Sequence, residues 1–305
     1  MGVELELQGV PVADLAALVA GVLRGETKTK STVRFLATAP GGDPWRIEVD
    51  YRLLQELAEQ AEAGDPLKSL LADALEVATS VVVPCEIVSP PLPMDGMDEV
   101  LDRLVPALRA AGARGTRHTP WYAFGVHFNV DLPNSDAETL LAYLQAFVCA
   151  YDWLLWHGRV DPTRRLTPYI DGYPREYELL LTHPGYAPAF DRLADDYLAH
   201  NPTRNRGLDL LPLLMHRDEK RVRAVVDDPL VLPRPALHYR LANCSVDEPG
   251  WSLRDPWADW VAVERLAEDR PALAACCAAF REHRQQLLHP LKSEWRKASA
   301  KWLER

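Results

Sequence analysis

The sequence predicts an α+β fold built around a mainly antiparallel sheet. Short segments with alternating apolar and polar residues, typical of half-buried strands, are spread along the chain. Segments with helical periodicity lie between them, but strands and helices do not alternate in the strict order of a doubly wound fold. The 305 residues can bury a sizeable core, as one large domain or two closely packed ones.

The first predicted strand covers residues 2–8. A side-chain period of two places Glu4 and Glu6 on one face and the apolar residues between them on the other. Two carboxylates on one strand face can hold a hard cation. An edge strand with one solvated face carries the same pattern, so the segment by itself leaves both interpretations open.

A helix over residues 14–23, ending at Gly25, and then a hairpin with strands at 33–36 and 45–51 are predicted next. Lys30 and Arg34 lie before or on the first hairpin strand and are candidates for binding phosphate on charge alone. A solvated charged strand explains Lys30 more simply.

Two more segments complete the first part of the chain. A helix is predicted from residue 53 to about residue 78, and a short apolar strand at 84–88 carries the single carboxylate of Glu86. Prolines at 90, 91 and 93 end that strand, and an amphipathic helix follows over residues 98–111.

Two later strands repeat the one-sided polar pattern. Residues 125–130 place His127 and Asn129 on one face, and residues 237–241 do the same with His238 and Arg240. Carboxylates and an imidazole can hold magnesium, and magnesium together with arginine can neutralise phosphate oxygens. The recurrence of this pattern predicts a site for a hard cation and an anionic ligand on one sheet face.

The second half of the chain is predicted to be largely helical. The apolar stretch 140–156, preceded by the capping box at 135–138, is interpreted as a buried core helix and is too short and polar to span a membrane. Residues 159–205 are rich in Pro, Tyr and Arg and are expected to form a long irregular lid or substrate-binding insertion. A helical region follows from residue 257 to residue 305.

Composition narrows the possible partners and surroundings. A formal charge of −10 argues against a nucleic-acid partner, which would require a basic surface. The five cysteines have no zinc-ligand spacing and suggest reduced thiols. No leader sequence is recognised at the N-terminus, so we expect a cytoplasmic protein without a membrane partner. The oligomeric state stays open, and a homo-oligomer is possible in principle.

The order of these motifs resembles that of the amidoligase family, which is similar to glutamate-cysteine ligase and glutamine synthetase. The matching segments run in order through roughly residues 2 to 265: they are 2–6, 85–92, 111–113, 125–130, 205–210 and 238–243. The resemblance implies a single catalytic domain over residues 1–305, with a curved, mainly antiparallel sheet, helices on one face and a glutamine synthetase-like fold.

The resemblance also implies roles for individual residues. Glu4, Glu6 and Glu86 would bind magnesium, and His127 would contact the metal or the nucleotide phosphate. Arg240 would touch the transferring phosphoryl group, and either Arg204 or Arg206 would steady the phosphate or an acyl-phosphate intermediate.

The chain departs from the family pattern at two positions. Asn129 replaces the second histidine of a His-x-His motif, where it is expected to contact the cofactor, and His238 replaces a metal-binding glutamate. Neutral imidazole still ligates a metal but supplies no negative charge, so manganese could replace magnesium.

The function implied is an ATP-dependent carboxylate-amine ligase that forms an amide or isopeptide bond through an acyl phosphate. Arginine-rich segments at 114–118 and 159–175 suggest small-molecule or peptide substrates with acidic groups. Two alternatives stay open: a non-catalytic nucleotide- or metabolite-binding relative, and a metal-dependent hydrolase.

Overall fold

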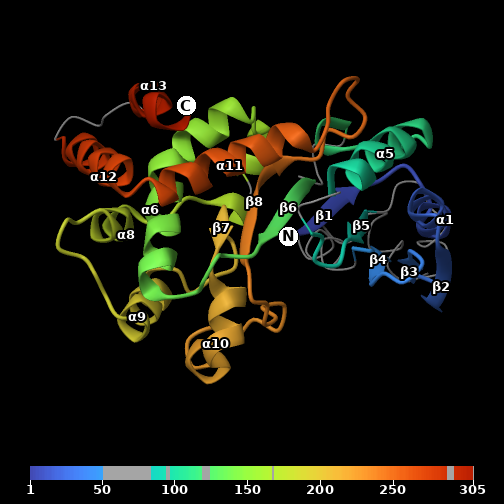
Figure 1. Ribbon diagram of the computed structural model, residues 1–305, viewed down its shortest axis with the longest axis horizontal. Coiled ribbons are helices and arrows are strands. Elements are labelled where there is room, and N and C mark those ends of the chain that lie inside the picture. The colour runs from blue at the N-terminus through green and yellow to red at the C-terminus, as the bar shows by residue number, and fades with distance from the viewer. Residues whose placement is uncertain (51–83, 94–96, 119–123, 167, 287–291, 305) are drawn as a thin grey trace, which may run out of the picture. The chain divides into compact units, whose positions relative to one another are not determined.

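The computed structural model describes residues 1–50, 84–93, 97–118, 124–166, 168–286 and 292–304 (Figure 1). Over these ranges the protein is α+β, with one open, antiparallel sheet of eight strands in the order β2-β3-β4-β5-β1-β6-β8-β7. The predicted class is therefore confirmed. The helix predicted from residue 53 to about residue 78 lies outside the described residues.

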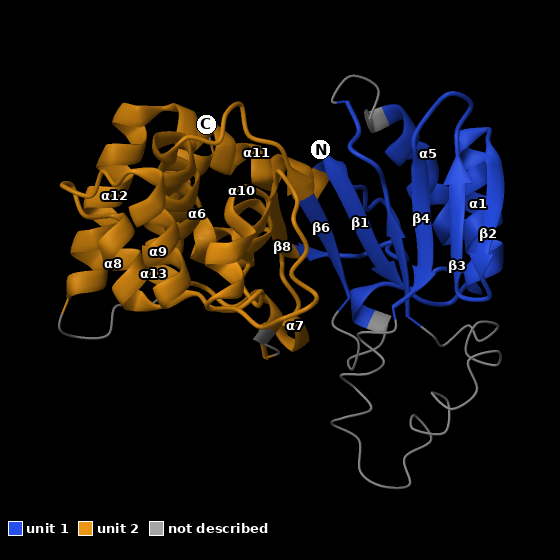
Figure 2. Cartoon of the chain, turned by 90° about the horizontal axis from the view of Figure 1, so that it is seen from below, with its two compact units in different colours: residues 1–128, 242–254 blue, residues 129–241, 255–305 orange. Residues whose placement is uncertain are grey.

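The chain divides into two compact units (Figure 2). Unit 1 contains residues Met1–Phe128 and Ala242–Arg254, and unit 2 contains residues Asn129–Leu241 and Asp255–Arg305. The division falls inside strands β6 (Gly125–Val130) and β8 (Leu237–Asn243), so each unit is assembled from two separate segments of the chain.

Unit 1 is a twisted layer of strands covered by helices on its apolar face. Its other elements are β1 (Gly2–Leu7), α1 (Val12–Leu23), β2 (Glu26–Ser31), β3 (Arg34–Thr38), β4 (Pro44–Val49), β5 (Cys85–Val88), α5 (Met97–Ala110) and the short helix η1 (Thr116–His118). The predicted hairpin is present as β3 and β4, which pair antiparallel. Strand β2 was not predicted, because all six of its residues are exposed and it therefore shows no apolar alternation.

The core of unit 1 follows from the period of two along its strands. Leu5 of β1 faces Ile87 of β5, and Ile87 faces Ile47 of β4, so the three apolar side chains form a row across the sheet. All three are buried, as is Leu15 of α1, the helix that contacts β3 and β4. The same alternation sends the polar side chains of these strands to the opposite face.

Unit 2 is mainly helical. It contains α6 (Ala137–His157), α7 (Pro162–Leu166), η2 (Pro168–Ile170), α8 (Arg175–Leu181), α9 (Phe190–His200), β7 (Leu208–Asp209), α10 (Leu211–Arg223), α11 (Arg254–Glu268), α12 (Arg270–Gln285) and α13 (Lys292–Leu303). Helix α6 is in contact with α8, α9, α12 and α13. It therefore forms the centre of this unit.

Helix α6 is long and apolar enough to cross a membrane by length and composition alone, contrary to the expectation from the sequence. It is the one such helix among the residues that the structure covers, and 83% of its apolar window is buried. Its role is that of a core helix. The N-cap is Asp136, whose carboxylate accepts a hydrogen bond from Thr139 N at 2.7 Å, so the capping box predicted to start at Ser135 is displaced by one residue.

The expectation of a long irregular stretch over residues 159–205 is wrong. This stretch contains α7, η2, α8 and α9. Its prolines punctuate a series of short helices, since Pro162 and Pro168 begin α7 and η2 and Pro174 precedes α8. Proline frequency alone does not distinguish short proline-capped helices from a loop.

Candidate functional site

The polar face of β1 and the start of β6 gather carboxylates around an imidazole in unit 1. His127 Nδ1 lies 3.2 Å from Glu4 Oε2, and His127 Nε2 lies 3.6 Å from Glu6 Oε1. The second oxygen of Glu6 accepts a hydrogen bond from Gly125 N at 2.7 Å. Glu4 and His127 are each only 5% exposed, so these groups interact away from bulk water.

Three carboxylates form a row across neighbouring strands of the same face. Glu6 of β1 faces Glu86 of β5, and Glu86 faces Glu48 of β4. Like charges directly opposite each other on a sheet destabilise it unless cations are close. Arg34 and Arg46 supply part of this charge, because their Nε atoms lie 2.5 and 2.7 Å from the carboxylate of Glu48.

The strand order removes the edge-strand explanation for Glu4 and Glu6. Strand β1 lies between β5 and β6. A central strand with carboxylates on one face is unusual, and Glu86 on the neighbouring strand is 3% exposed.

The two candidate phosphate-binding cations of the first hairpin lie in different places. Arg34 is at the end of the carboxylate row, paired with Glu48. Lys30 is on the exposed strand β2, at an irregularity in the register between Thr29 and Ser31. The structure thus brings Arg34, and not Lys30, into line with the carboxylates.

The polar face of β8 carries a second constellation, in unit 2. His238 Nδ1 lies 2.8 Å from Asn129 Oδ1, and the same oxygen accepts a hydrogen bond from Arg234. A carbonyl oxygen only accepts, so His238 must carry its proton on Nδ1 in the neutral form. In that tautomer the lone pair of the ring is on Nε2, the type of nitrogen through which histidine ligates metals.

Arg240 and Arg204 lie together near a buried carboxylate. Arg240 Nη1 donates to the carbonyl of Arg204 at 2.8 Å, and Arg204 Nε lies 3.2 Å from Asp228 Oδ2. Asp209, which is 2% exposed, faces His238 across the β7–β8 pair.

The carboxyl of Asp209 is the most perturbed acid of this group. Burial raises its pKa to about 7, against the lowering effects of a hydrogen bond from Leu211 N and of the charges on Arg240, Arg204 and Arg234. Asp209 is thus poised between its neutral and charged forms near neutral pH.

Three residues of this region were not assigned a role from the sequence: Arg234, Asp209 and Arg164. Arg164 of α7 is 2% exposed and donates to the carbonyls of Arg240 and Leu241 at 2.8 and 2.7 Å. It holds the backbone of β8 where Arg240 projects. No sequence signal separates Arg164 from the neighbouring arginines, whereas Asp209 could have been noticed as an acid inside an apolar segment.

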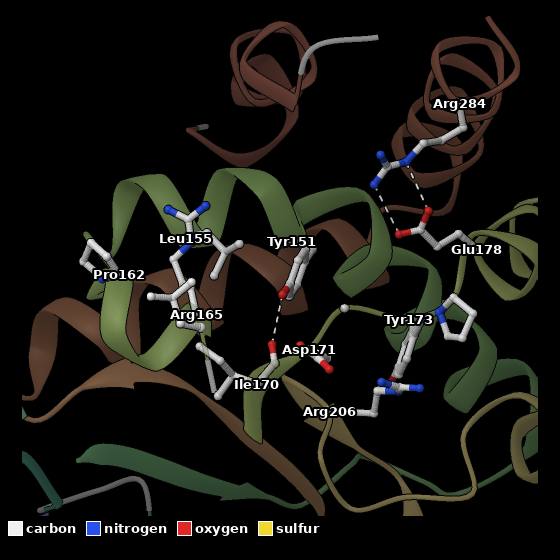
Figure 3. Close-up of a pocket in the computed structure, with 13 residues that line it drawn as sticks. Tyr151, Leu155, Pro162, Arg165, Ile170, Asp171, Tyr173, Glu178, Arg206 and Arg284 are labelled. Carbon is white, nitrogen blue, oxygen red and sulfur yellow. Dashed lines mark hydrogen bonds and ion pairs between the residues drawn. The ribbon is translucent and has the colours of Figure 1, made fainter. Parts of the chain in front are cut away.

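Arg204 and Arg206, which the sequence left as alternatives, have different surroundings. Arg206 lines a cavity of about 690 Å³ and donates from Nε to Asn201 Oδ1 at 2.8 Å (Figure 3). Its charge lowers the pKa of Asp171, whereas the charge of Arg204 lowers the pKa of Asp209. Arg204 is therefore the one of the two that accompanies Arg240.

The chain matches a family model described as "putative amidoligase enzyme" over residues 1–262. The chain belongs to this amidoligase family. The match spans every strand of the sheet and most of α11, so the resemblance seen in the motif order is confirmed. No curated protein and no solved structure matches the chain. Membership in the amidoligase family makes a ligase role plausible for the residues assembled above.

Proposed function

We propose that the protein is an ATP-dependent carboxylate-amine ligase. The observation that carries the proposal is the row of Glu6, Glu86 and Glu48 beside His127, in a chain of the amidoligase family. Carboxylates placed opposite one another across neighbouring strands favour a concentrated positive charge between them, and a divalent cation bound with ATP provides one.

The donor set in unit 1 fits a hard divalent cation. Glu4, Glu6 and Glu86 offer carboxylate oxygens and His127 an imidazole nitrogen, and no thiol lies among them. Magnesium, or manganese, would supply charge neutralisation at the phosphate oxygens when bound. By the family resemblance His238, whose Nδ1 lies 2.8 Å from Asn129 Oδ1, is a further proposed ligand.

The arginines of unit 2 suit the charge that develops on a transferred phosphoryl group. Arg240 and Arg204 are proposed to contact phosphate, with Arg234 and Asn129 fixing the orientation of His238. Arg34, and on charge alone Lys30, remain proposed nucleotide contacts. Such a site acts mainly by positioning and electrostatic stabilisation.

The reaction has two steps. A carboxylate oxygen of the first substrate attacks the terminal phosphorus of ATP, the bond to the bridging oxygen breaks, and ADP leaves. The amine nitrogen of the second substrate then attacks the acyl carbon, and phosphate departs with the bonding electron pair while the nitrogen loses a proton. We propose small molecules or peptides as the two substrates, a cytoplasmic setting and a glutamine synthetase-like fold.

The proposal is tested with the purified protein of residues 1–305, ATP and magnesium or manganese, incubated with amino acids and acidic dipeptides. Phosphate release that requires both a carboxylate and an amine, with an amide product seen by mass spectrometry, is the expected result. ATP binding without turnover under any pairing would favour a non-catalytic binding relative. Amide cleavage that needs metal but not ATP would favour a hydrolase.

A further inference from the structure

The cavity of unit 2 that Arg206 lines lies apart from Arg240 and Arg204, the residues proposed to contact phosphate. It is lined by α6, α7, the segment leading into α8, and Arg206 (Figure 3). Its volume of about 690 Å³ is in the range of sites that bind small molecules. None of Arg240, Arg204, Asp209 and His238 lines it.

Asp171 and Arg206 lie side by side in this cavity without pairing. Their backbones form a parallel β-bridge, and Gly207 N donates to the carbonyl of Asp171 at 3.0 Å. In the described part of the chain, the carboxylate of Asp171 makes no hydrogen bond or ion pair, and the guanidinium of Arg206 bonds only Asn201, through Nε. Both nitrogens at the end of Arg206 are therefore open to a ligand.

The other charged groups that line the cavity are already paired or stand apart. Arg284 lies 3.1 Å from Glu178 and 3.5 Å from Asp152, so its guanidinium is already engaged by these two carboxylates. Arg165 of α7 adds a further guanidinium at the cavity, on the opposite side from Arg206 in Figure 3. One carboxylate and one unpaired guanidinium thus remain as neighbours.

Between these charges the wall is apolar. Leu155 and Ile170 line it, together with Tyr151, whose hydroxyl donates to the carbonyl of Ile170 at 2.9 Å. Because that hydroxyl is engaged, Tyr151 presents its ring, which lies against Gly172. A ligand that binds the charged residues through polar groups could therefore pack an apolar side chain against this wall.

We propose that this cavity binds a free α-amino acid, with its ammonium on Asp171 and its carboxylate on Arg206. Interpreting this ligand as the amine substrate of the ligase rests on the proposed function, but the binding does not. The guanidinium of Arg165 disfavours an amino acid with a cationic side chain.

The short distance between Asp171 and Arg206 favours an α-amino acid over an amino acid whose ammonium and carboxylate are further apart. Residues paired across a bridge lie about 5 Å apart, so the ligand groups that meet them must also be close. In an α-amino acid the ammonium and carboxylate are attached to one carbon. A carboxylate also matches the fork of a guanidinium with two parallel hydrogen bonds.

The test measures binding by calorimetry to the protein of residues 1–305, without ATP or metal. The probes are L-leucine, 4-methylpentanoate, which lacks the ammonium, and 3-methylbutylamine, which lacks the carboxylate. L-leucine is expected to bind about 10- to 100-fold more tightly than either analogue, because each analogue loses one charged contact. L-lysine is expected to bind more weakly than L-leucine, and Arg165→Gln should reduce that difference.

Two variants assign the contacts. Asp171→Asn should weaken L-leucine binding about 10- to 100-fold and leave binding of 4-methylpentanoate unchanged. Arg206→Lys keeps the charge but loses the fork, and should weaken both carboxylates. Glu176→Gln, an exposed acid of α8 outside the cavity, is the matched control and should bind as the native protein does.

The inference is overturned if folded protein does not bind L-leucine, or if Asp171→Asn binds it with native affinity. Equal affinity for L-leucine and 4-methylpentanoate would also overturn it. Because ATP and metal are absent, a negative result leaves the ligase proposal standing. Conversely, if the protein binds L-leucine but shows no ligase turnover, the binding site is supported and the ligase proposal is not.

Discussion

The residues that distinguish this protein are acids buried where most proteins place apolar side chains. Glu4, Glu86 and Asp209 are 5%, 3% and 2% exposed. Burial disfavours the charged form of an acid, whereas nearby cations favour it. In unit 1 the carboxylates face one another, and in unit 2 Asp209 has three arginines as electrostatic neighbours. These opposite surroundings lead to different predictions for the two units.

Glu86→Gln should remove most metal-dependent ATP binding without unfolding the protein. The change keeps the volume of the side chain but removes the central charge of the row between Glu6 and Glu48. Loss of one metal-bound charge should weaken Mg-ATP binding at least about 10-fold. Thermal shift with and without Mg-ATP measures this, with the exposed Glu26→Gln of β2 as control. A native shift in Glu86→Gln would remove that carboxylate from the ligand set.

Asp209→Asn should make stability less dependent on pH. The folded-state pKa of Asp209, about 7, is above its ordinary value of 3.8, so the folded protein binds more protons than the unfolded chain between these values. Its contribution to stability is therefore full below pH 3.8 and is lost as pH rises through about 7.

The measurement is the thermal midpoint of the native protein and of Asp209→Asn from pH 5 to pH 8.5. The thermal midpoint of Asp209→Asn minus that of the native protein should increase by at least about 2 °C as pH rises over this range. A difference that is constant across this range would show that Asp209 keeps an ordinary pKa.

At the scale of elements, the C-terminal end of α1 shows that a glycine can be required for a reason other than the one its position in the sequence suggests. The sequence places a helix end at Gly25, as if glycine were needed for a left-handed backbone. The left-handed residue is Arg24, with φ of 53°. Gly25 is required for space, because a Cβ there would lie 1.9 Å from the carbonyl oxygen of Thr38.

Gly25→Ala should destabilise the protein, and Gly21→Ala in the same helix should stabilise it. An added methyl at residue 25 forces α1 and β3 apart, at a cost of about 1 to 3 kcal/mol. A methyl at residue 21 meets no atom within 4 Å and should contribute about 0.5 to 1 kcal/mol through helix propensity. Urea denaturation of the two variants measures both effects. The same sign for both would contradict the steric explanation.

Arg164→Met should destabilise the protein by several kcal/mol. The carbonyls of Arg240 and Leu241 would both lose a buried donor, each at a cost of about 1 to 3 kcal/mol. Arg165→Met on the exposed side of the same short helix is the matched control and should cost less than about 0.5 kcal/mol. Equal denaturation midpoints for the two variants would rule out a supporting role for Arg164.

At the scale of the whole molecule, the chain leaves unit 1 after Phe128 and returns to it at Ala242. The returning segment is bound to the first one within unit 1. Thr116 N donates to the carbonyl of Cys244 at 2.8 Å, and Cys244 N donates to Thr116 Oγ1 at 2.8 Å. A Cβ on Gly115 would lie 1.7 Å from that same carbonyl oxygen, so the two backbones are in close contact.

A fragment of residues 1–128 should therefore fail to fold alone. It lacks the partner of Thr116 and Gly115, and the buried backbone groups there would have no replacement. Circular dichroism and amide dispersion in NMR spectra compare the fragment with the full chain. A cooperative thermal transition in the isolated fragment would show that the returning segment is dispensable.

The residues assigned from the sequence come from the side-chain period of two, which backbone geometry imposes on any strand. That period placed Glu4 with Glu6, and His238 with Arg240, because alternation is local and needs no knowledge of neighbouring strands. It also gave the α+β class. The same period did not predict strand β2, because β2 is exposed and has no apolar face. It also did not predict the short helices between the prolines of residues 159–205.

The tertiary structure alone decided which of these faces meet which partners. Strand order made β1 a central strand, put Glu86 opposite Glu6, and brought Asn129 to His238 from 109 residues away. It also placed Arg206 beside Asp171. Such neighbours depend on how elements pack over long sequence separations, whereas alternation and helical periodicity depend only on the dihedral angles of a few consecutive residues. The sequence by itself thus determined the class of the fold and the chemistry of its faces, and packing decided where that chemistry is assembled.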